Sequence, residues 1–224
     1  MPWSWRASEY TGLSAGQPEP DATLLLGRTG ELFDTAEGRA ISVMPGGIPI
    51  VTPSSTSLTP PEPDRVEVGH VRIIGGVRPQ NFDVGYRPDG VRFAFDSKTL
   101  NDQKSIGKNW QNMINDLAIE ATTVHTRFPH AVVAFMVVLP QPVTTPAVLA
   151  PMTETLERMA RRSNVTDPAH LAEAVSLILW HPQDGSIHPA MPDPNSLLRI
   201  ERFSEFVEAA YVTRYKGLPP HRDE

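Results

Sequence analysis

The sequence predicts an α/β fold, in which a mixed central sheet begins with a β-meander and is flanked by helices. Three observations predict this class. Alternating apolar and polar residues indicate three consecutive strands between residues 65 and 99, and a long amphipathic helical pattern follows them. Two further apolar segments, separated by a helical pattern, then supply strands that are buried on both faces.

The three strands of the predicted meander are "RVEVGHVRIIGG", "FDVGYRP" and "VRFAFDSKT". Asp89 and Gly90 lie between the second strand and the third. Asp-Gly between alternating apolar segments is typical of a two-residue type I′ turn, in which both turn residues need positive φ. With residues 89 and 90 as the loop, residues whose numbers sum to 179 face each other, so Asp83 lies opposite Asp96.

The same register separates the two faces of this hairpin. One face is rich in aromatic residues and is expected to face the core; it carries Phe82, Val84, Tyr86, Phe93 and Phe95. The other face carries both aspartates, the lysine, two arginines and two small residues, namely Asp83, Gly85, Arg87, Arg92, Ala94, Asp96 and Lys98. The small residues, Gly85 and Ala94, are expected to leave room for a group that approaches the aspartates.

A helix is predicted over residues 105–126, because apolar residues recur there at spacings of three and four. The segment 131–139 is apolar at every position, so we expect an interior strand. Thr145 and Pro146 then mark the cap and first residue of a helix over 146–162.

The last part of the chain predicts a short helix, a strand and a final helix. Asp167-Pro168 repeats the helix start signal, and "AVSLILW" at 174–180 indicates another buried strand. An amphipathic pattern over 202–216 predicts the final helix, with Ser204 as its cap if the helix starts one turn later.

Composition is that of a soluble protein with one main domain. The chain has 224 residues, of which 40% are hydrophobic and 21% charged, and it holds no cysteine, which excludes disulfides and thiolate metal sites. Its longest apolar run, 131–139, is too short to cross a bilayer, so we expect a cytoplasmic protein with no membrane partner. Residues 1–63 are rich in proline, glycine and serine and predict a partly irregular segment before an α/β domain at 64–224.

Net charge and missing motifs exclude several functions. A formal charge of −6 argues against a chain that coats nucleic acid by general electrostatics, although it permits a local basic groove. The sequence has no GxGxxG, GxxxxGK[ST] or GxSxG motif, and its histidines lack the HExxH spacing of zinc enzymes.

The facing aspartates are the strongest functional signal in the sequence. Two carboxylates about 5 Å apart repel by about 1 kcal/mol in water and about 3 kcal/mol at an effective dielectric constant of about 20, so Asp83 and Asp96 need a cation. Mg²⁺, with Mn²⁺ as a substitute, fits because it binds one or two carboxylates, several waters and substrate phosphate. Lys98 lies about 7 Å beyond Asp96 on the same face, whereas Asp89 is about 20 Å from Asp83 by strand rise and is excluded from the site.

These residues resemble the motif of the PD-(D/E)xK nuclease superfamily, whose members have a restriction-endonuclease-like core. The resemblance covers residues 65–139 and is centred on Asp96-Ser97-Lys98, with an aspartate thirteen residues upstream of Asp96. It implies that Asp83 and Asp96 ligate Mg²⁺ and that the carbonyl of Ser97 is a further ligand. It also implies that Lys98 assists the water that attacks phosphorus.

The resemblance extends to residues outside the meander. Many members place a glutamine or another polar residue of the following helix beside the site, and Gln111 matches this position better than Lys108 or Asn109. Members often add an acidic residue from a helix before the meander. Glu31 and Glu37 are the candidates here, although their segment shows no convincing helical pattern.

The predicted function is a Mg²⁺-dependent endonuclease that hydrolyses DNA, of a restriction or phage-defence type. Two alternatives stay open: a non-catalytic nucleic-acid-binding or assembly subunit of the same fold, and an effector that cleaves RNA. A homodimer or a partner subunit is compatible with any of them. A simpler interpretation is an exposed sheet face on which Lys98, Arg87 and Arg92 neutralise the aspartates in structural ion pairs.

Overall fold

The structure is a computed structural model that describes five parts of the chain: residues 50–51, 66–100, 103–141, 144–181 and 186–218. The predicted irregular segment 1–63 lies outside the described residues, apart from Ile50–Val51. The two upstream candidates, Glu31 and Glu37, lie outside them as well.

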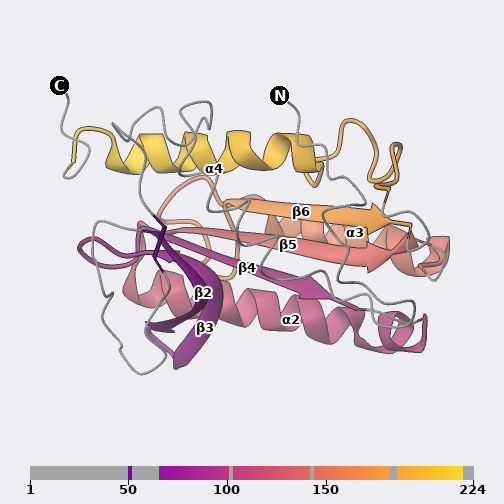
Figure 1. Cartoon of the computed structure of the whole chain (residues 1–224), viewed down its shortest axis with the longest axis horizontal. Coiled ribbons are helices and arrows are strands. Elements are labelled where there is room, and N and C mark those ends of the chain that lie inside the picture. The colour runs from indigo at the N-terminus through magenta and orange to yellow at the C-terminus, as the bar shows by residue number, and fades with distance from the viewer. Residues whose placement is uncertain (1–49, 52–65, 101–102, 142–143, 182–185, 219–224) are drawn as a thin grey trace.

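A six-stranded mixed sheet forms the centre of the molecule, with its strands in sequence order (Figure 1). The strands are β1 (Ile50–Val51), β2 (Val66–Ile74), β3 (Pro79–Tyr86), β4 (Phe93–Thr99), β5 (Val132–Pro140) and β6 (Ala174–Trp180). β2, β3 and β4 are antiparallel, as the meander predicts, whereas β4, β5 and β6 are parallel and β1 is parallel to β2. The predicted α/β class with a mixed sheet is confirmed.

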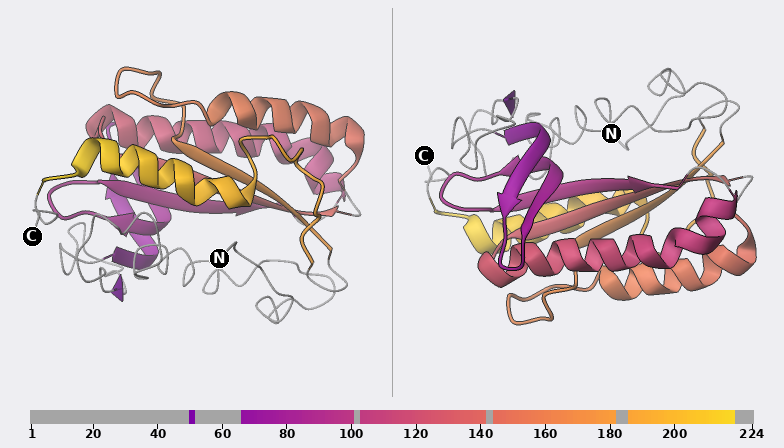
Figure 2. Two further views of the ribbon diagram at one scale, coloured as in Figure 1. Left: turned by 90° about the horizontal axis from the view of Figure 1, so that it is seen from above. Right: turned by 90° about the horizontal axis from the view of Figure 1, so that it is seen from below.

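Both faces of the sheet are covered by the helices of the described chain, which are α2 (Gln103–Arg127), α3 (Pro146–Met159) and α4 (Ile200–Tyr215). α2 and α3 follow β4 and β5, respectively, as crossover helices, and they lie side by side on one face, while α4 covers the other (Figure 2). β5 is consequently buried at every position, which explains its uninterrupted apolar sequence. None of the described helices combines the length and the hydropathy needed to cross a bilayer.

Most element boundaries agree with the sequence pattern. The helix predicted over 105–126 is α2, and the strand predicted over 174–180 is β6. α3 begins at Pro146, as predicted, but ends about one turn early. α4 begins at Ile200, so Ser204 lies inside the helix rather than at its cap.

The helix predicted after Asp167 is wrong, because the segment between α3 and β6 forms turns. The carboxylate of Asp167 accepts hydrogen bonds from the backbone N–H groups of Ser163 and Asn164, at 2.9 Å and 2.8 Å. Asp167 therefore closes a loop with residues before it instead of capping a helix after it, which is the competing role of aspartate side chains in turns.

The connection between β3 and β4 corrects the predicted two-residue turn. β3 ends at Tyr86 and β4 begins at Phe93, so the connection is longer. Within it only Gly90 has positive φ, at 129°, whereas a type I′ turn also needs positive φ at Asp89. The predicted register nevertheless holds, because the longer loop is still centred on residues 89 and 90; Tyr86 faces Phe93, Gly85 faces Ala94 and Val84 faces Phe95.

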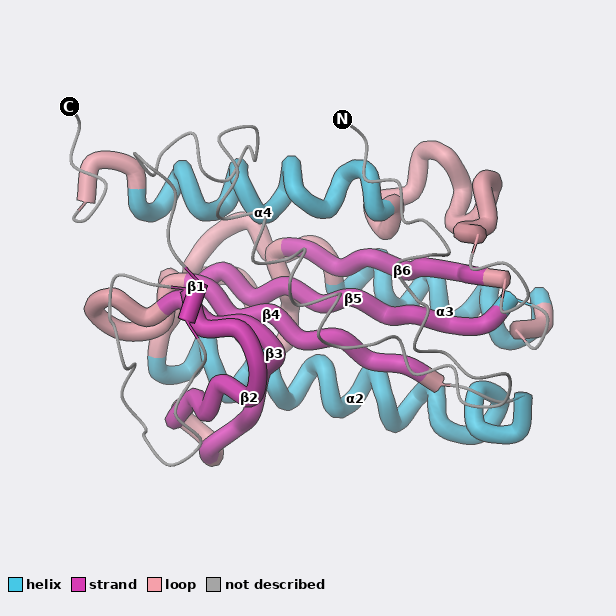
Figure 3. The backbone as a smooth tube through the Cα atoms, viewed as in Figure 1, coloured by secondary structure: helices cyan, strands magenta, loops and turns pink. Residues whose placement is uncertain are grey.

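The first half of β3 departs from the predicted faces. Phe82 was expected beside Val84 on the aromatic face, but it packs in the core beneath α2, while Val84 packs beneath α4. The ladder between β2 and β3 is irregular between Val68 and Val71, and an irregularity of this kind bends a strand and increases its twist. Figure 3 shows the resulting curl of β2 and β3 away from the other strands.

The expected open space beside the aspartates is filled. Ala94 is buried in the core beneath α2. A Cβ atom added at Gly85 would lie 2.7 Å from Cγ1 of Val71, so the neighbouring strand already occupies that space. The two small residues therefore serve packing, and room for a ligand has to come from elsewhere.

Candidate functional site

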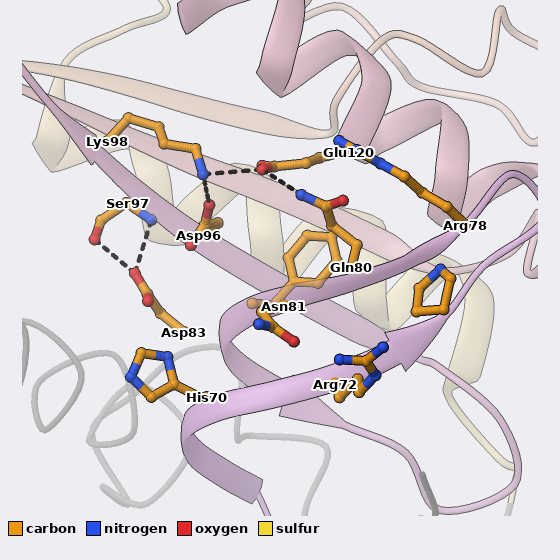
Figure 4. Close-up of a pocket in the computed structure, with 12 residues that line it drawn as sticks. His70, Arg72, Arg78, Gln80, Asn81, Asp83, Asp96, Ser97, Lys98 and Glu120 are labelled. Atoms are coloured by element: carbon orange, nitrogen blue, oxygen red, sulfur yellow. Dashed lines mark hydrogen bonds and ion pairs between the residues drawn. The ribbon is translucent and has the colours of Figure 1, made fainter. Parts of the chain in front are cut away.

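A polar pocket of about 520 Å³ lies between the curled β2–β3 ribbon, β4 and α2 (Figure 4). This volume is within the usual range for ligand sites. One part of the lining is formed by Asp83, Asp96, Ser97, Lys98 and Glu120. A second part carries the exposed basic residues His70, Arg72 and Arg78. The lining residues that the structure describes come from one span of chain, from β2 to α2.

Asp83 reaches across from β3 to β4. Its Oδ2 accepts hydrogen bonds from the backbone N–H of Ser97, at 2.9 Å, and from the Ser97 hydroxyl, at 2.6 Å. These bonds hold the Asp83 carboxylate at the end of the β3–β4 ladder, next to Asp96. Ser97 thus positions Asp83 through its amide and hydroxyl, and the metal-ligand role of its carbonyl stays a prediction.

Lys98 bridges two carboxylates from different elements. Its ammonium forms an ion pair with Oδ2 of Asp96 on the same strand, and it donates to Oε1 of Glu120 on α2 at 2.9 Å. The amide of Gln80 donates to the same Oε1 at 2.8 Å. Oε2 of Glu120 is buried and accepts no hydrogen bond from the described residues.

Negative charge exceeds positive charge in this part of the pocket, because three carboxylates accompany one ammonium. Burial and the charge of Asp83 raise the pKa of Asp96 to about 8, although Lys98 acts in the opposite direction. Burial disfavours the charged form of Lys98, but the carboxylates of Asp96 and Glu120 outweigh this effect and raise its pKa. Lys98 therefore stays charged, and the cluster favours a further cation.

The two aspartates suit the ligand preferences of Mg²⁺. Oδ2 of Asp83 is engaged by Ser97 and Oδ2 of Asp96 by Lys98, whereas Oδ1 of each carboxylate receives no hydrogen bond from the described residues. No three acidic, histidine or cysteine side chains converge as a metal cage within the described ranges. Mg²⁺ typically uses one or two carboxylates and keeps several waters, so two carboxylates meet its needs.

Four of the five predicted site residues come together in the pocket, and Gln111 does not. Gln111 is exposed on α2 and lies outside the pocket lining, which instead contains Glu120 from the same helix. Nine positions separate them, which at about 3.6 residues per turn places them on opposite sides of the helix. Glu120 is only 2% exposed and lies on the buried stripe with Leu117 and Val124, so a charged residue on an apolar stripe was the signal for it.

The interpretation of the aspartates as members of structural ion pairs needs Lys98, Arg87 and Arg92 beside them. Two of these three cations bind other acids. Arg87 is buried and binds Glu67 through two hydrogen bonds of 2.6 Å each. Arg92 binds Asp89 with its Nε at 2.8 Å, and neither residue of this pair lines the pocket. Lys98 alone remains beside Asp96, and Asp89 is outside the site, as the sequence predicts.

The ribbon that forms the outer wall of the pocket is fixed against α2. The backbone N–H of Gly76 donates to the carbonyl of Thr123 at 2.7 Å, and Arg127 donates to the carbonyl of Ile74 at 3.0 Å. A Cβ at Gly75 would lie 2.2 Å from the Thr123 carbonyl oxygen, a contact that only glycine avoids. The two glycines at the ribbon tip therefore permit the close approach that shapes the pocket.

Comparison with models of known families, with curated proteins and with solved structures found no match to this chain. The functional interpretation therefore depends on the chemistry of the pocket. Two carboxylates from adjacent strands, a charged lysine and exposed arginines together suit a divalent cation and a phosphate group.

Proposed function

We propose that the chain is a Mg²⁺-dependent phosphodiesterase of the PD-(D/E)xK superfamily, acting as an endonuclease on DNA. The observation that carries this proposal is the convergence of Asp83, Asp96 and Lys98 in one polar pocket, from two adjacent strands. Their positions agree with the residues that the resemblance to this superfamily implies. The motif alone would be weak support, and the shared pocket strengthens it.

Each side chain has a role that follows from its contacts. Asp83 and Asp96 would hold the metal through their free Oδ1 atoms, with Ser97 fixing the first carboxylate. These carboxylates would thereby place Mg²⁺ where it would polarise the scissile phosphate and lower the pKa of a bound water. Lys98, kept cationic by Asp96 and Glu120, would orient the attacking water and stabilise negative charge that develops on the phosphate oxygens.

Metal-dependent cleavage tests this function directly. Purified protein is incubated with plasmid, linear DNA and RNA, with Mg²⁺ or with EDTA. We expect cleavage of DNA that needs Mg²⁺, and a loss of about 10²- to 10³-fold in Asp83→Ala, Asp96→Ala and Lys98→Ala, the scale for removing one preorganised electrostatic group. Asp116→Ala is the matched control, because Asp116 is an exposed acid of α2 outside the pocket.

The outcomes separate the alternatives. Full activity in Asp96→Ala would dismiss the assignment. Calorimetric binding of Mg²⁺ or Mn²⁺ that needs Asp83, without cleavage of any substrate, would identify a non-catalytic subunit of the same fold. Cleavage of RNA alone would identify an RNA-cleaving effector, and the restriction or phage-defence role then has no basis.

A further inference from the structure

The pocket carries two arginines whose side chains have no acceptor within the described parts of the chain. The other arginines there donate to a carboxylate or a backbone carbonyl; they are Arg87, Arg92, Arg127, Arg158, Arg161, Arg162, Arg199, Arg202 and Arg214. Arg72 and Arg78 are exposed, and both line the pocket. Guanidinium groups held without a partner at the wall of a site are available for an anionic ligand.

We infer that Arg72 and Arg78 bind the phosphate backbone of the DNA strand that enters the pocket, an inference that rests on the proposed function for the identity of the polymer. A guanidinium presents a planar fork of donors that matches phosphate oxygens in a bidentate geometry. The chain as a whole has a charge of −6 and repels a polyanion. A local pair of arginines is therefore needed to bring a phosphate to the carboxylates.

The positions of the pocket residues determine the path of the bound DNA strand. Figure 4 shows Gln80 and Asn81 between the arginines and the two aspartates. The phosphate at Asp83 and Asp96 is the one to be cleaved, so the arginines contact phosphates further along the same strand. Gln80 and Asn81, which also line the pocket, offer amide groups along this path.

The position of the arginines on a fixed ribbon gives them a binding role rather than a catalytic one. Arg72 faces Asn81 in the β2–β3 ladder, and Arg78 follows the ribbon tip that Gly76 anchors to α2. Contacts to phosphates away from the reacting group strengthen substrate binding and register. Loss of these contacts should therefore raise Kd and KM more than it lowers kcat.

The test compares two double variants that remove the same charge. Arg72→Ala/Arg78→Ala removes the proposed phosphate contacts. Arg158→Ala/Arg161→Ala, called the α3 variant, removes two exposed arginines outside the pocket, one in the last turn of α3 and one just after the end of that helix. Fluorescence anisotropy measures binding of a labelled DNA duplex in EDTA, at several salt concentrations. Single-stranded DNA and RNA of the same sequence form further arms. Thermal unfolding shows whether each variant is folded.

We expect the pocket variant to bind duplex DNA at least roughly tenfold more weakly than the α3 variant. The slope of log K against log[salt] is negative, and for this variant it should become shallower by about 1.8, the value for two lost phosphate contacts on B-DNA. Equal affinities and slopes in the two variants would overturn the inference, as would RNA binding that depends on the arginines while DNA binding does not.

Different results would contradict the inferred arginine contacts and the proposed enzymatic function. If the wild type binds DNA through the two arginines but never cleaves it with Mg²⁺, the inferred arginine contacts are supported and the proposed enzymatic function is wrong. If the wild type cleaves DNA and the pocket variant cleaves it with unchanged KM, the function stands and the arginine contacts are wrong.

Discussion

Two clusters of charged side chains lie against the same sheet and differ in their balance of charge. The pocket cluster, formed by Asp83, Asp96, Lys98 and Glu120, has three acids and one lysine. The Glu173 cluster has one acid, Glu173, whose Oε1 lies 2.8 Å from Nη1 of Arg214 and 3.0 Å from Nε of Arg162, while its Oε2 lies 3.3 Å from Nε2 of His125.

The pKa of an acid moves in opposite directions in the two clusters. Burial alone would raise the pKa of Glu173, but His125, Arg214 and the backbone N–H of Val133 outweigh it and lower that pKa. Burial raises the pKa of Asp96 to about 8, and the charge of Asp83 adds to it. A buried acid with several cationic and N–H partners ties elements together, whereas buried acids that outnumber their cations mark a place where a ligand supplies the missing charge.

The largest expected difference between the clusters is in stability. Glu173→Gln leaves Arg162 and Arg214 without a buried counter-charge, and breaking a buried pair in this way costs about 3 to 5 kcal/mol. We expect the free energy of unfolding, from urea denaturation, to fall by this amount. A loss below about 1 kcal/mol would show that the Glu173 cluster does not hold the fold together.

The next difference is the sign of the pH dependence. The folded pKa of Asp96 lies above its ordinary value of 3.8, so the stability that its protonated form contributes is present below about pH 4 and is lost as the pH rises towards 8. In EDTA, Asp96→Asn should therefore be more stable than the wild type at pH 9, where the wild type carries an unfavourable buried charge, and nearly equal to it at pH 4.

Glu173 has the opposite sign, because a lowered pKa contributes stability above the ordinary pKa that is lost as the pH falls. The free energy of unfolding of Glu173→Gln should consequently approach that of the wild type as the pH falls. Urea denaturation of both variants between pH 4 and pH 9 measures the two slopes. Parallel slopes would contradict the distinction between the clusters.

The smallest expected effect concerns Glu120, which acts through Lys98. Glu120→Gln keeps the shape of the side chain but removes a charge that raises the pKa of Lys98. We expect kcat for DNA cleavage to fall about tenfold, or about 1.4 kcal/mol in the barrier. The alkaline limit of the pH–rate profile should also move to lower pH. A reduced rate with an unchanged profile would mean that Glu120 only supports packing.

The strand part of the site could be predicted from the sequence because it depends on a period of two. Gly85 faces Ala94 and Val84 faces Phe95 in the predicted register, which brings Asp83 next to Asp96 at the end of the ladder; this register holds despite the incorrect turn because the actual loop keeps the same centre. Lys98 follows Asp96 on the same face at a fixed spacing. Local alternation thus determined three of the pocket residues.

The remaining features could not be predicted because they depend on how elements pack. Glu120 meets Lys98 across 22 positions of sequence, and that contact requires the direction and rotation of α2. Phe82 changed faces because β2 and β3 curl, which strand alternation does not encode. Arg72 and Arg78 reach the pocket through the same curl. For Glu120, an acid within the apolar stripe of the helix was the available clue.

Among the described residues, one span of chain, from His70 to Glu120, contributes the side chains that line the pocket, while β5, β6, α3 and α4 support it from outside. A chimaera that exchanges residues 66–127 would transfer all the described pocket residues in a single piece. The pocket and its supporting scaffold could then come from two different parent proteins. The parallel pairing between β4 and β5 would have to be kept in such a chimaera.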